Sequence, residues 1–312
     1  MRLIVTGASG QFGRMVTERL LERVSASDLI LVTRNPSTLA HLKARGAEVR
    51  AGDFDKPESL PAAFAGGERM LLISTLSVGR RAEQHLRALN AALAAGVRYI
   101  AYTSSGGMNP HNPALIVPDH MRTEAALKAS GVAFTILRDS LYIEAPLHQI
   151  APRALAVGKW ISSSGEGRVG FVAKADCVAV AATVLTGNGH EGKTYEITGP
   201  ELLSFREVAA IAAQVDGRPV QYVDVSDEAM AAMLAAAGVP KHYMDGMHTP
   251  GVGTSSIADI VSYERGIRGG FFAIRSDDVA GILGRAPVSL GELFRANKSA
   301  LRPPAGTGAD FL

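Results

Sequence analysis

Apolar and polar residues follow a regular order along the first part of the chain. Short runs rich in Val, Ile and Leu stand at residues 2–6, 29–33, 47–51, 69–74, 98–103 and 133–138. Amphipathic or alanine-rich segments separate them, near residues 12–23, 37–45, 57–65, 80–95 and 119–130. Strands that are apolar on both faces and are joined by helices form a parallel sheet covered on both sides. The pattern therefore predicts a doubly wound α/β fold.

The order changes in the second half of the chain. Residues 174–185 are typical of a helix, and residues 193–198 are typical of a strand that returns to the sheet. Residues 204–217 and 226–238 each begin with Ser and end with Gly, which are favoured at the two ends of a helix. We therefore expect a smaller, mainly helical second domain. The predicted sheet domain comprises residues 1–145 with 174–198 returning to it, and the second domain comprises residues 146–173 and 199–312.

Three segments lack a clear helix or strand pattern. The stretch "SSSGEG" at residues 162–167, which follows an expected helix, is interpreted as a flexible link. The glycine-rich residues 246–270 predict a surface loop or lid, and residues 301–312 predict a frayed tail.

The turn after the first strand carries a motif with a clear mechanism. "TGASGQFG" places Gly7, Gly10 and Gly13 between a strand that ends at Thr6 and a helix that begins near Gln11. Glycines permit a tight turn and a close backbone approach, and the helix N-terminus offers free N–H groups to a pyrophosphate. The motif in this context predicts a dinucleotide site.

The end of the second strand indicates which dinucleotide binds. NAD sites usually carry an acid there for the ribose hydroxyls, but "LVTRNPS" has none. Arg34 can pair with a 2′-phosphate through its planar fork, which favours NADP(H) over NAD(H); an ordinary surface arginine is the alternative. Asp53 and Phe54, after the third strand, are candidates to flank the adenine, although a simple turn is also consistent.

Polar residues also follow the later strands. Ligands of such folds bind outside the carboxyl ends of the strands. Candidate cofactor contacts at these ends are Ser74, Thr75, Leu76, Thr103, Asp139, Ser140 and Tyr142.

The usual proton donor of carbonyl reductases is missing. No tyrosine has a lysine four residues further along the chain. His120 and Glu124 share one face of the helix near 119–130, where an imidazole beside a carboxylate can donate a proton, but an exposed pair is also consistent. Tyr142 is a second candidate donor, and a phenol fixed by packing is its alternative.

Composition and charge narrow the class of protein. Charged residues make up 20%, and the net charge of +2 is spread without basic clusters, so neither nucleic acid nor an anionic membrane is expected as a partner. No apolar run reaches the ~18 residues of a membrane span, and the N-terminus is expected to be a strand and not a signal peptide. These features favour a cytoplasmic protein. The single Cys177 is expected in the core, the scattered histidines predict no metal site, and a homodimer remains an open possibility.

Several phrases of the sequence together resemble one family. They are "TGASGQFG", "SASDLILVTRNP", "GAEVRAGDFDKPESLPAAFAG", "LLIS", "AAGVRYIAYTS", "LRDSLYIE" and "GHEGKTYEITG". By these phrases the chain resembles the NmrA-like group of atypical short-chain dehydrogenases. Within that group it is most similar to the members that reduce quinones and triphenylmethane dyes with NADPH. The resemblance implies a Rossmann domain with a C-terminal cap over the substrate. It also implies cofactor contacts from residues 7–13, which include Ser9, Gln11 and Phe12, from residues 139–144 and from Lys174.

The missing acid pair leads to a hypothesis of function. Hydride addition to a quinone or a cationic dye gives a delocalised or neutral product, so the protein needs only to align donor and acceptor. We therefore expect an NADPH-dependent reductase of a quinone-like or other aromatic small molecule. A non-catalytic NADP(H)-sensing regulator, or a pathway-specific enzyme for an aromatic polyketide-like substrate, is the alternative. The chain departs from the family in two places. Asp139 stands where an Asn is expected, which bears on the contacts to the nicotinamide amide, and the insertion at 249–259 leaves the substrate open.

Overall fold

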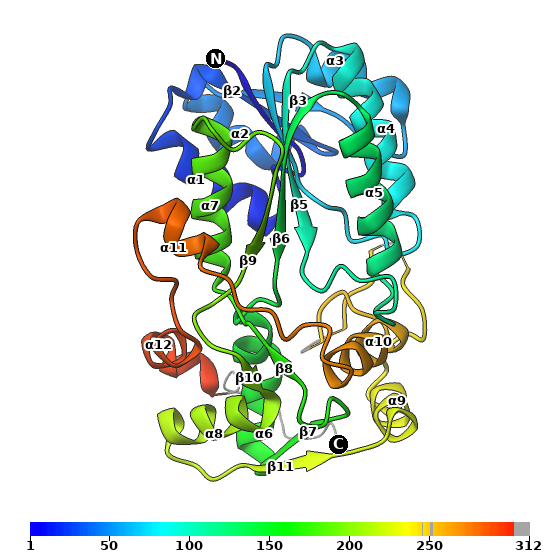
Figure 1. Cartoon of the computed structure of the whole chain (residues 1–312), viewed down its shortest axis with the longest axis vertical. Coiled ribbons are helices and arrows are strands. Elements are labelled where there is room, and N and C mark those ends of the chain that lie inside the picture. The colour runs from blue at the N-terminus through cyan, green and yellow to red at the C-terminus, as the bar shows by residue number, and fades with distance from the viewer. Residues whose placement is uncertain (245, 250–251, 303–312) are drawn as a thin grey trace.

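A seven-stranded parallel sheet forms the larger domain (Figure 1). The structure, a computed structural model, describes residues 1–244, 246–249 and 252–302. The sheet has the order β3-β2-β1-β4-β5-β6-β9, and all of its neighbouring strands are parallel. Its strands are β1 (Leu3–Val5), β2 (Leu29–Thr33), β3 (Glu48–Ala51), β4 (Arg69–Leu72), β5 (Tyr99–Ser105), β6 (Ala133–Asp139) and β9 (Lys193–Ile197). The predicted doubly wound α/β fold is confirmed.

Helices cover both faces of the sheet (Figure 1). Leu3 and Val5 pack into one core beside Val16, whereas Ile4 packs into the other core beside Leu89, as expected for a strand that is apolar on both sides. One face carries α1 (Gln11–Leu21), α7 (Lys174–Thr186) and α11 (Asp278–Leu283). The other carries α3 (Leu60–Phe64), α4 (Arg81–Ala94) and α5 (Val117–Ala129), and the short α2 (Ala40–Ala44) joins β2 to β3. Cys177 lies in the first core, fully buried, as expected.

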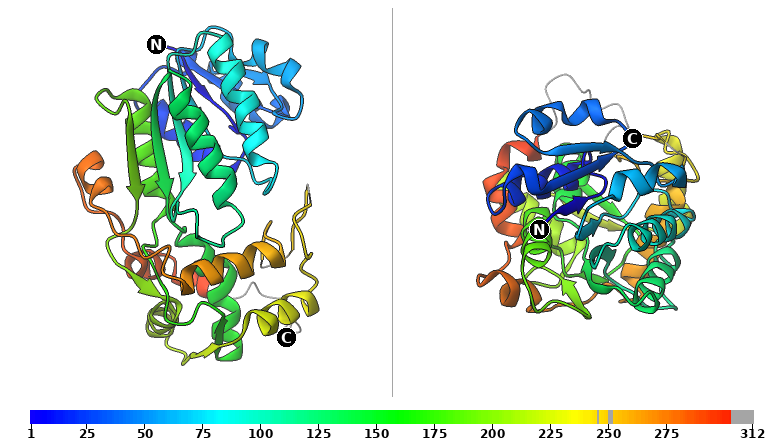
Figure 2. Two further views of the ribbon diagram at one scale, coloured as in Figure 1. Left: turned by 45° about the vertical axis from the view of Figure 1, so that its right-hand side comes forward. Right: turned by 90° about the horizontal axis from the view of Figure 1, so that it is seen from above.

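The second domain lies at the carboxyl ends of the strands and is referred to below as the cap (Figure 1). Its first part comprises the π-helix at Pro146–Ile150, α6 (Ala151–Val157), β7 (Lys159–Ser162) and β8 (Arg168–Val169). Its second part comprises β10 (Leu203–Ser204), α8 (Phe205–Asp216), β11 (Gln221–Asp224), α9 (Asp227–Ala236), α10 (Ile257–Arg268) and α12 (Leu290–Ala296). Trp160 and Phe294 are fully buried in a separate core of the cap. The two lobes are distinct in Figure 2.

The cap contains short strands that the sequence pattern did not reveal. β7 pairs with β11 in parallel, and β8 pairs with β10 antiparallel. Each of these strands has two to four residues, too few for an alternating pattern to be recognised, and each pairs with a partner distant in sequence.

The interpretation of residues 162–167 as a flexible link is wrong at its serines. Ser162, Ser163 and Ser164 are buried, with at most 1% relative exposure. Glu264 of α10 accepts a hydrogen bond from the Ser162 hydroxyl at 2.6 Å and another from the Ser163 amide. A partner from a distant helix therefore fixes a stretch whose composition alone suggests mobility.

The prediction of a loop over residues 246–270 is also wrong in part. Residues 257–268 form α10, which begins with a capping box between Ser256 and Asp259. The preceding glycines obscured this start signal. Of the predicted tail, Leu301 is buried in the cap, and residues 303–312 lie outside the described residues.

Candidate active site

A cleft lies along the carboxyl ends of the strands, between the sheet domain and the cap. Its lining includes the turn at Gly7–Gly13, residues 32–34 after β2, residues 52–55 after β3 and residues 73–77 after β4. The remaining lining residues are Gln84, Tyr142, Lys174, Tyr243, Gly246, Met247, His248 and Thr254. The last five belong to the segment between α9 and α10, which rises from the cap toward the sheet domain (Figure 2).

The glycine turn has the geometry that a dinucleotide needs. Gly7 has φ +59°, a conformation that side chains other than glycine rarely adopt. A Cβ atom at Gly13 would lie 2.4 Å from the carbonyl oxygen of Gly7, so only glycine allows the helix to start so close to the turn. The N-cap of α1 is Gly10, whose residue type offers no side chain to bind the free N–H groups. The turn can therefore receive an anion at the start of α1.

Arg34 stands exposed at the end of β2 and lines the cleft. Within the described part of the chain, no hydrogen bond or ion pair is found for its guanidinium group. Behind it, the hydroxyls of Ser9 and Thr33 share a hydrogen bond of 2.7 Å that ties the glycine turn to β2. The end of β2 that carries Arg34 is thus tied to the turn, and the exposed Arg34 side chain is available to a ligand.

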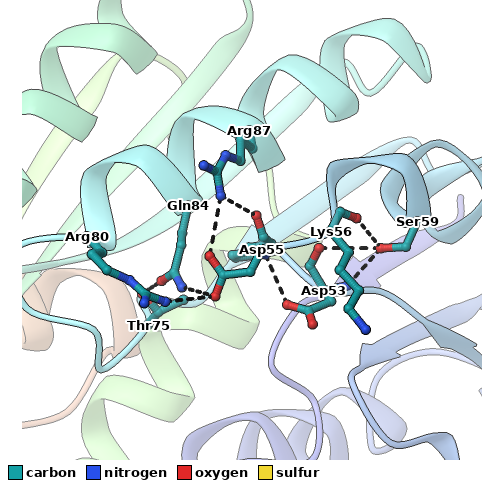
Figure 3. Close-up of polar contacts among 9 residues, drawn as sticks. Asp53, Asp55, Lys56, Ser59, Thr75, Arg80, Gln84 and Arg87 are labelled. Carbon is teal, nitrogen blue, oxygen red and sulfur yellow. Dashed lines mark hydrogen bonds and ion pairs between the residues drawn. The ribbon is translucent and has the colours of Figure 1, made fainter. Parts of the chain in front are cut away.

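Acidic residues after β3 are joined to α4 by a polar cluster (Figure 3). Asp53 accepts a hydrogen bond from the backbone amide of Asp55 at 3.0 Å, which is a local turn. The Asp55 carboxylate accepts from Gln84 at 2.8 Å and from Arg80 at 3.0 Å, and Arg87 lies within 3.3 Å. Asp53 and Phe54 both line the cleft, and Asp53 also forms the local turn. A position beside the adenine and a simple turn are therefore compatible predictions for these residues.

Three side chains of α4 hold Thr75 in the loop after β4. The Thr75 amide donates to Nε2 of His85 at 3.0 Å, and the Thr75 carbonyl oxygen accepts from Arg81 at 2.6 Å. The Thr75 hydroxyl donates to Gln84 at 2.6 Å. The amide, the carbonyl and the hydroxyl of Thr75 are therefore all hydrogen-bonded, and these bonds fix the backbone of the loop at the cleft.

His120 lies behind this loop and outside the cleft lining. Arg81 donates to its Nε2 atom at 3.0 Å, so the imidazole proton must be on Nδ1, which donates to the Tyr102 hydroxyl at 2.7 Å. The residue has 3% relative exposure. Burial and the neighbouring Arg81 and His85 keep the pKa of His120 well below its usual value, so the imidazole is neutral.

Glu124 does not pair with His120, although both lie on the same helix. Its carboxylate accepts two hydrogen bonds from Arg138, at 2.8 and 3.0 Å, and one from Ser104 at 2.7 Å. Burial opposes the charge, but these donors hold the pKa of Glu124 below its usual value. The exposed pair considered from sequence is thus two buried groups in separate networks.

Tyr142 contributes its ring to the cleft and directs its hydroxyl to Asp139. The hydroxyl donates to Oδ2 of Asp139 at 2.9 Å, and the ring stacks on Phe12 with centroids 6.5 Å apart. Lys174 places its ammonium 5.2 Å from the Tyr142 ring centroid and donates to Gln11 at 2.7 Å. Burial and the neighbouring Asp139 raise the pKa of Tyr142 well above its usual value.

Most of the residues proposed from sequence for the cofactor meet in one cleft. Those in its lining are Gly7, Ser9, Gly10, Gln11, Phe12, Gly13, Arg34, Asp53, Phe54, Ser74, Thr75, Leu76, Tyr142 and Lys174. Thr103, Asp139 and Ser140 are buried and lie outside the lining. Thr103 accepts a hydrogen bond from the Ser74 amide at 2.9 Å, so it supports the loop after β4.

Sequence reasoning missed a smaller group of lining residues. Asp55, Ser77 and Gln84 adjoin residues that the strand pattern identified, so a wider window around each strand end would include them. Tyr243, Met247 and His248 come from the segment before α10, and no local signal connects them with the glycine turn.

The sequence of this chain is similar to that of a known family and of several known proteins. The family model described as NAD(P)H-binding matches residues 7–187. The chain belongs to the NAD(P)H-binding family. Quinone oxidoreductase 2 of Escherichia coli is 38% identical over 253 residues, which cover 81% of this chain and 88% of that protein. NAD(P)H azoreductase of Xenophilus azovorans is 31% identical over 79% of this chain and 85% of that protein.

Solved structures of the same family superpose well on this chain. The NADPH-dependent quinone oxidoreductase of Escherichia coli, in complex with NADPH, has a TM-score of 0.84 and 35% identity, covering 93% of this chain and 98% of that structure. Triphenylmethane reductase of Citrobacter sp., in complex with NADP(H), also has a TM-score of 0.84, with 31% identity over 95% of this chain and 99% of that structure. The resemblance noted in the sequence, the expected NADP(H) cofactor and the expected enzyme class, NAD(P)H-dependent oxidoreductase, are confirmed.

Neither a membrane-spanning helix nor a metal site is found among the described residues. Among the residues that the structure describes, no helix is both long and apolar enough to cross a membrane. Over the same residues, no group of three or more His, Cys, Asp or Glu side chains is arranged to hold a metal ion.

Proposed function

We propose that this protein transfers hydride from NADPH directly to a quinone or another conjugated, electron-poor acceptor. The observation that carries this proposal is the cleft itself: neither of the two candidate donors, His120 and Tyr142, has a free proton directed into it, and Glu124, the expected partner of His120, has none either. Both nitrogens of His120 are engaged behind the loop, and the Tyr142 hydroxyl donates to Asp139. Glu124 is a carboxylate bound to Arg138.

The side chains in the lining support a planar acceptor. Phe12, Tyr142, Tyr243 and Met247 contribute aromatic or apolar side chains to the cleft. Such faces can align a flat ring with the cofactor and exclude water, and hydride addition to a quinone needs no simultaneous proton because the product anion is delocalised. NADPH, when bound, supplies the hydride.

The available contacts favour NADPH over NADH. Arg34 is the cation at the end of β2, where an acid would otherwise bind the ribose hydroxyls, and its guanidinium is exposed. The residues of the glycine turn would hold the pyrophosphate, and residues 74–76 would contact the cofactor between the pyrophosphate and the nicotinamide.

The test is a panel of acceptors. Purified protein is mixed with NADPH and, in separate reactions, with quinones, triphenylmethane dyes and simple aldehydes, while the nicotinamide absorbance is followed. We expect oxidation with quinones or dyes and little with aldehydes, because an aldehyde leaves an alkoxide that needs an acid. Turnover of aldehydes alone would contradict the proposal. Tight NADPH binding with no turnover of any acceptor would favour the sensing regulator.

A further inference from the structure

A buried carboxyl group lies directly behind the wall of the cleft. Asp139, at the end of β6, has 7% relative exposure, and its Oδ2 atom accepts the Tyr142 hydroxyl at 2.9 Å. Tyr142 lines the cleft, and Asp139 does not. One aromatic side chain therefore separates this carboxyl group from whatever the cleft holds.

No cation neutralises this carboxyl group within the part of the chain that the structure describes. Its Oδ1 atom is buried and has no hydrogen-bond partner. The neighbouring Arg138 is engaged by Glu124 and Glu196. A carboxylate with a buried, unpartnered oxygen is unfavourable, whereas a neutral carboxylic acid avoids the cost of burying a charge.

The groups around Asp139 do not change this balance. Those that face it or its direct neighbours are Tyr142, Glu144, Lys174, Asp176 and Cys177. Lys174 donates to Gln11 at 2.7 Å, and Asp176 is paired with Arg285 at 2.7 Å. Burial raises the pKa of Asp139 to about 7, and the hydrogen bond from Tyr142, followed by the influence of the Cys177 thiol, opposes the shift.

The location of this acid matters because the two forms of the cofactor differ in charge. The nicotinamide ring is neutral in NADPH and positive in NADP⁺. In a doubly wound sheet each half binds one half of the dinucleotide. Arg34 at β2 belongs to the adenosine half, so the ends of β5 and β6, which pair as far as Ser105 and Asp139, belong to the nicotinamide half.

We propose that Asp139, held between Tyr142 and α7, senses the charge of the nicotinamide ring and makes the preference between NADPH and NADP⁺ depend on pH. The neutral acid offers no attraction to the positive ring, whereas the carboxylate attracts it. By linkage, NADP⁺ binding promotes loss of the Asp139 proton to solvent. Below neutral pH the protein therefore retains its oxidised product less tightly. This inference rests on cofactor binding and not on any acceptor.

The experiment is an equilibrium titration of the protein with NADPH and with NADP⁺ at about pH 6 and about pH 8. The quantity of interest is the ratio of the two dissociation constants, NADP⁺ over NADPH. The 2′-phosphate titrates in the same range, but it is common to both forms and cancels in the ratio. If NADP⁺ lowers the pKa of Asp139 by about one unit, the ratio falls about fivefold as the pH rises.

Three variants distinguish Asp139 from its neighbours. Asp139→Asn should make the ratio independent of pH. Tyr142→Phe removes a hydrogen bond that lowers the pKa of Asp139, so the pH at which the ratio changes should move upward. Cys177→Ser should keep a pH-dependent ratio, which would exclude the thiol as the titrating group. If Asp139→Asn does not fold, the direction of the Tyr142→Phe shift still tests the proposal.

Infrared spectroscopy provides a readout that needs no cofactor. The free protein should show the band of a buried protonated carboxyl group at about pH 6, and this band should be lost at about pH 8 and absent from Asp139→Asn. A ratio that does not change with pH in the wild-type protein, although both cofactors bind, would overturn the proposal. So would the absence of the carboxyl band at the lower pH. Neither result depends on whether a quinone is reduced.

Discussion

Arg34 and Arg138 show how partners decide what a charged side chain can do. Arg34 directly follows β2, and Arg138 is the last residue but one of β6 in the same sheet. Arg138 donates to Glu124 and Glu196, and these hydrogen bonds keep it in place. Arg34 is exposed and lines the cleft. Only Arg34 can therefore give its full set of donors to a phosphate group.

Replacing Arg34 with Ala should weaken NADPH binding selectively. Loss of a charge-assisted contact of about 1.5–3 kcal/mol corresponds to a rise of about 10- to 100-fold in the dissociation constant for NADPH. The constant for NADH, which lacks the 2′-phosphate, should change little. Fluorescence titration measures both. Arg23→Ala, an exposed arginine beyond the far end of α1, is the matched control. Equal losses for the two cofactors would refute the assignment.

Both ring nitrogens of His120 are engaged by buried neighbours, so we expect this residue to take little part in proton transfer. His120→Ala should keep quinone turnover within about tenfold of wild type, because a general acid typically contributes about 10²–10⁴-fold. Thermal stability should fall, since Arg81 loses an acceptor that is buried. Steady-state kinetics and a melting curve separate the two effects. A loss of activity beyond a hundredfold in a folded variant would make His120 an acid after all.

At the scale of elements, α4 works as a support for the loop after β4. Its side chains bind the amide, the carbonyl and the hydroxyl of Thr75, and α5 and β5 hold two of these side chains from behind through Thr123, Tyr102 and His120. The loop after β4 is therefore positioned partly by Arg81 and His85, which lie outside the cleft lining. The local sequence predicts the helix, but it does not show that side chains of α4 hold the loop after β4.

The same network predicts a sensitivity to acid. Burial and the neighbouring Arg81 lower the pKa of His85 to about 3 from its usual 6.5. Between these values the unfolded chain binds a proton that the folded protein does not, so the free energy of unfolding should fall as the pH falls through this range. The slope is about 1.4 kcal/mol per pH unit for each such group. His85→Gln keeps an acceptor for Thr75 and does not titrate.

Urea unfolding at several pH values between about 4 and about 7 tests this expectation. The difference in stability between wild type and His85→Gln should shift in favour of the variant as the pH is lowered. A difference that stays constant with pH would show that His85 is not kept neutral by its surroundings.

At the scale of the whole molecule, the chain connects its two lobes repeatedly. It leaves the sheet after β6, builds α6, β7 and β8 in the cap, and returns as α7 and β9. It leaves again and comes back as α11, which packs against α7 and β9. Asp278 at the start of α11 accepts a hydrogen bond from the Glu196 amide at 2.8 Å. Neither lobe is a continuous stretch of sequence, so we expect the unfolding of one lobe to disturb the other.

The single tryptophan allows this coupling to be measured. Trp160 is fully buried in the core of the cap, while NADPH contacts are expected chiefly from the sheet domain. Thermal unfolding followed by tryptophan fluorescence should coincide with unfolding followed by far-ultraviolet circular dichroism. NADPH at about 100 times its dissociation constant should stabilise both transitions by about 2.7 kcal/mol. An early fluorescence transition that NADPH does not move would show that the cap unfolds independently.

The sequence by itself determined the parallel sheet, the dinucleotide turn and the candidate phosphate-binding arginine. Each of these depends on local rules: strands buried on both faces have apolar runs, a tight turn needs glycines, and an acid is either present or absent after β2. The family resemblance added the cofactor and the class of enzyme. These features could be predicted because each strand, turn or charged position is defined by residues within its own short segment.

Only the tertiary structure decided which polar groups are available to the cleft. His120 and Glu124 share a helix face, but Arg81 and Arg138, which come from other elements, engage them separately. From sequence, Ser162 belongs to a predicted flexible link, but in the structure its hydroxyl is bound to Glu264. From sequence, Asp139 is a polar residue at the end of a strand, but in the structure it is buried beside α7 without a counter-ion. Charge state and hydrogen-bond direction depend on neighbours that are distant in sequence, and folding alone brings those neighbours together.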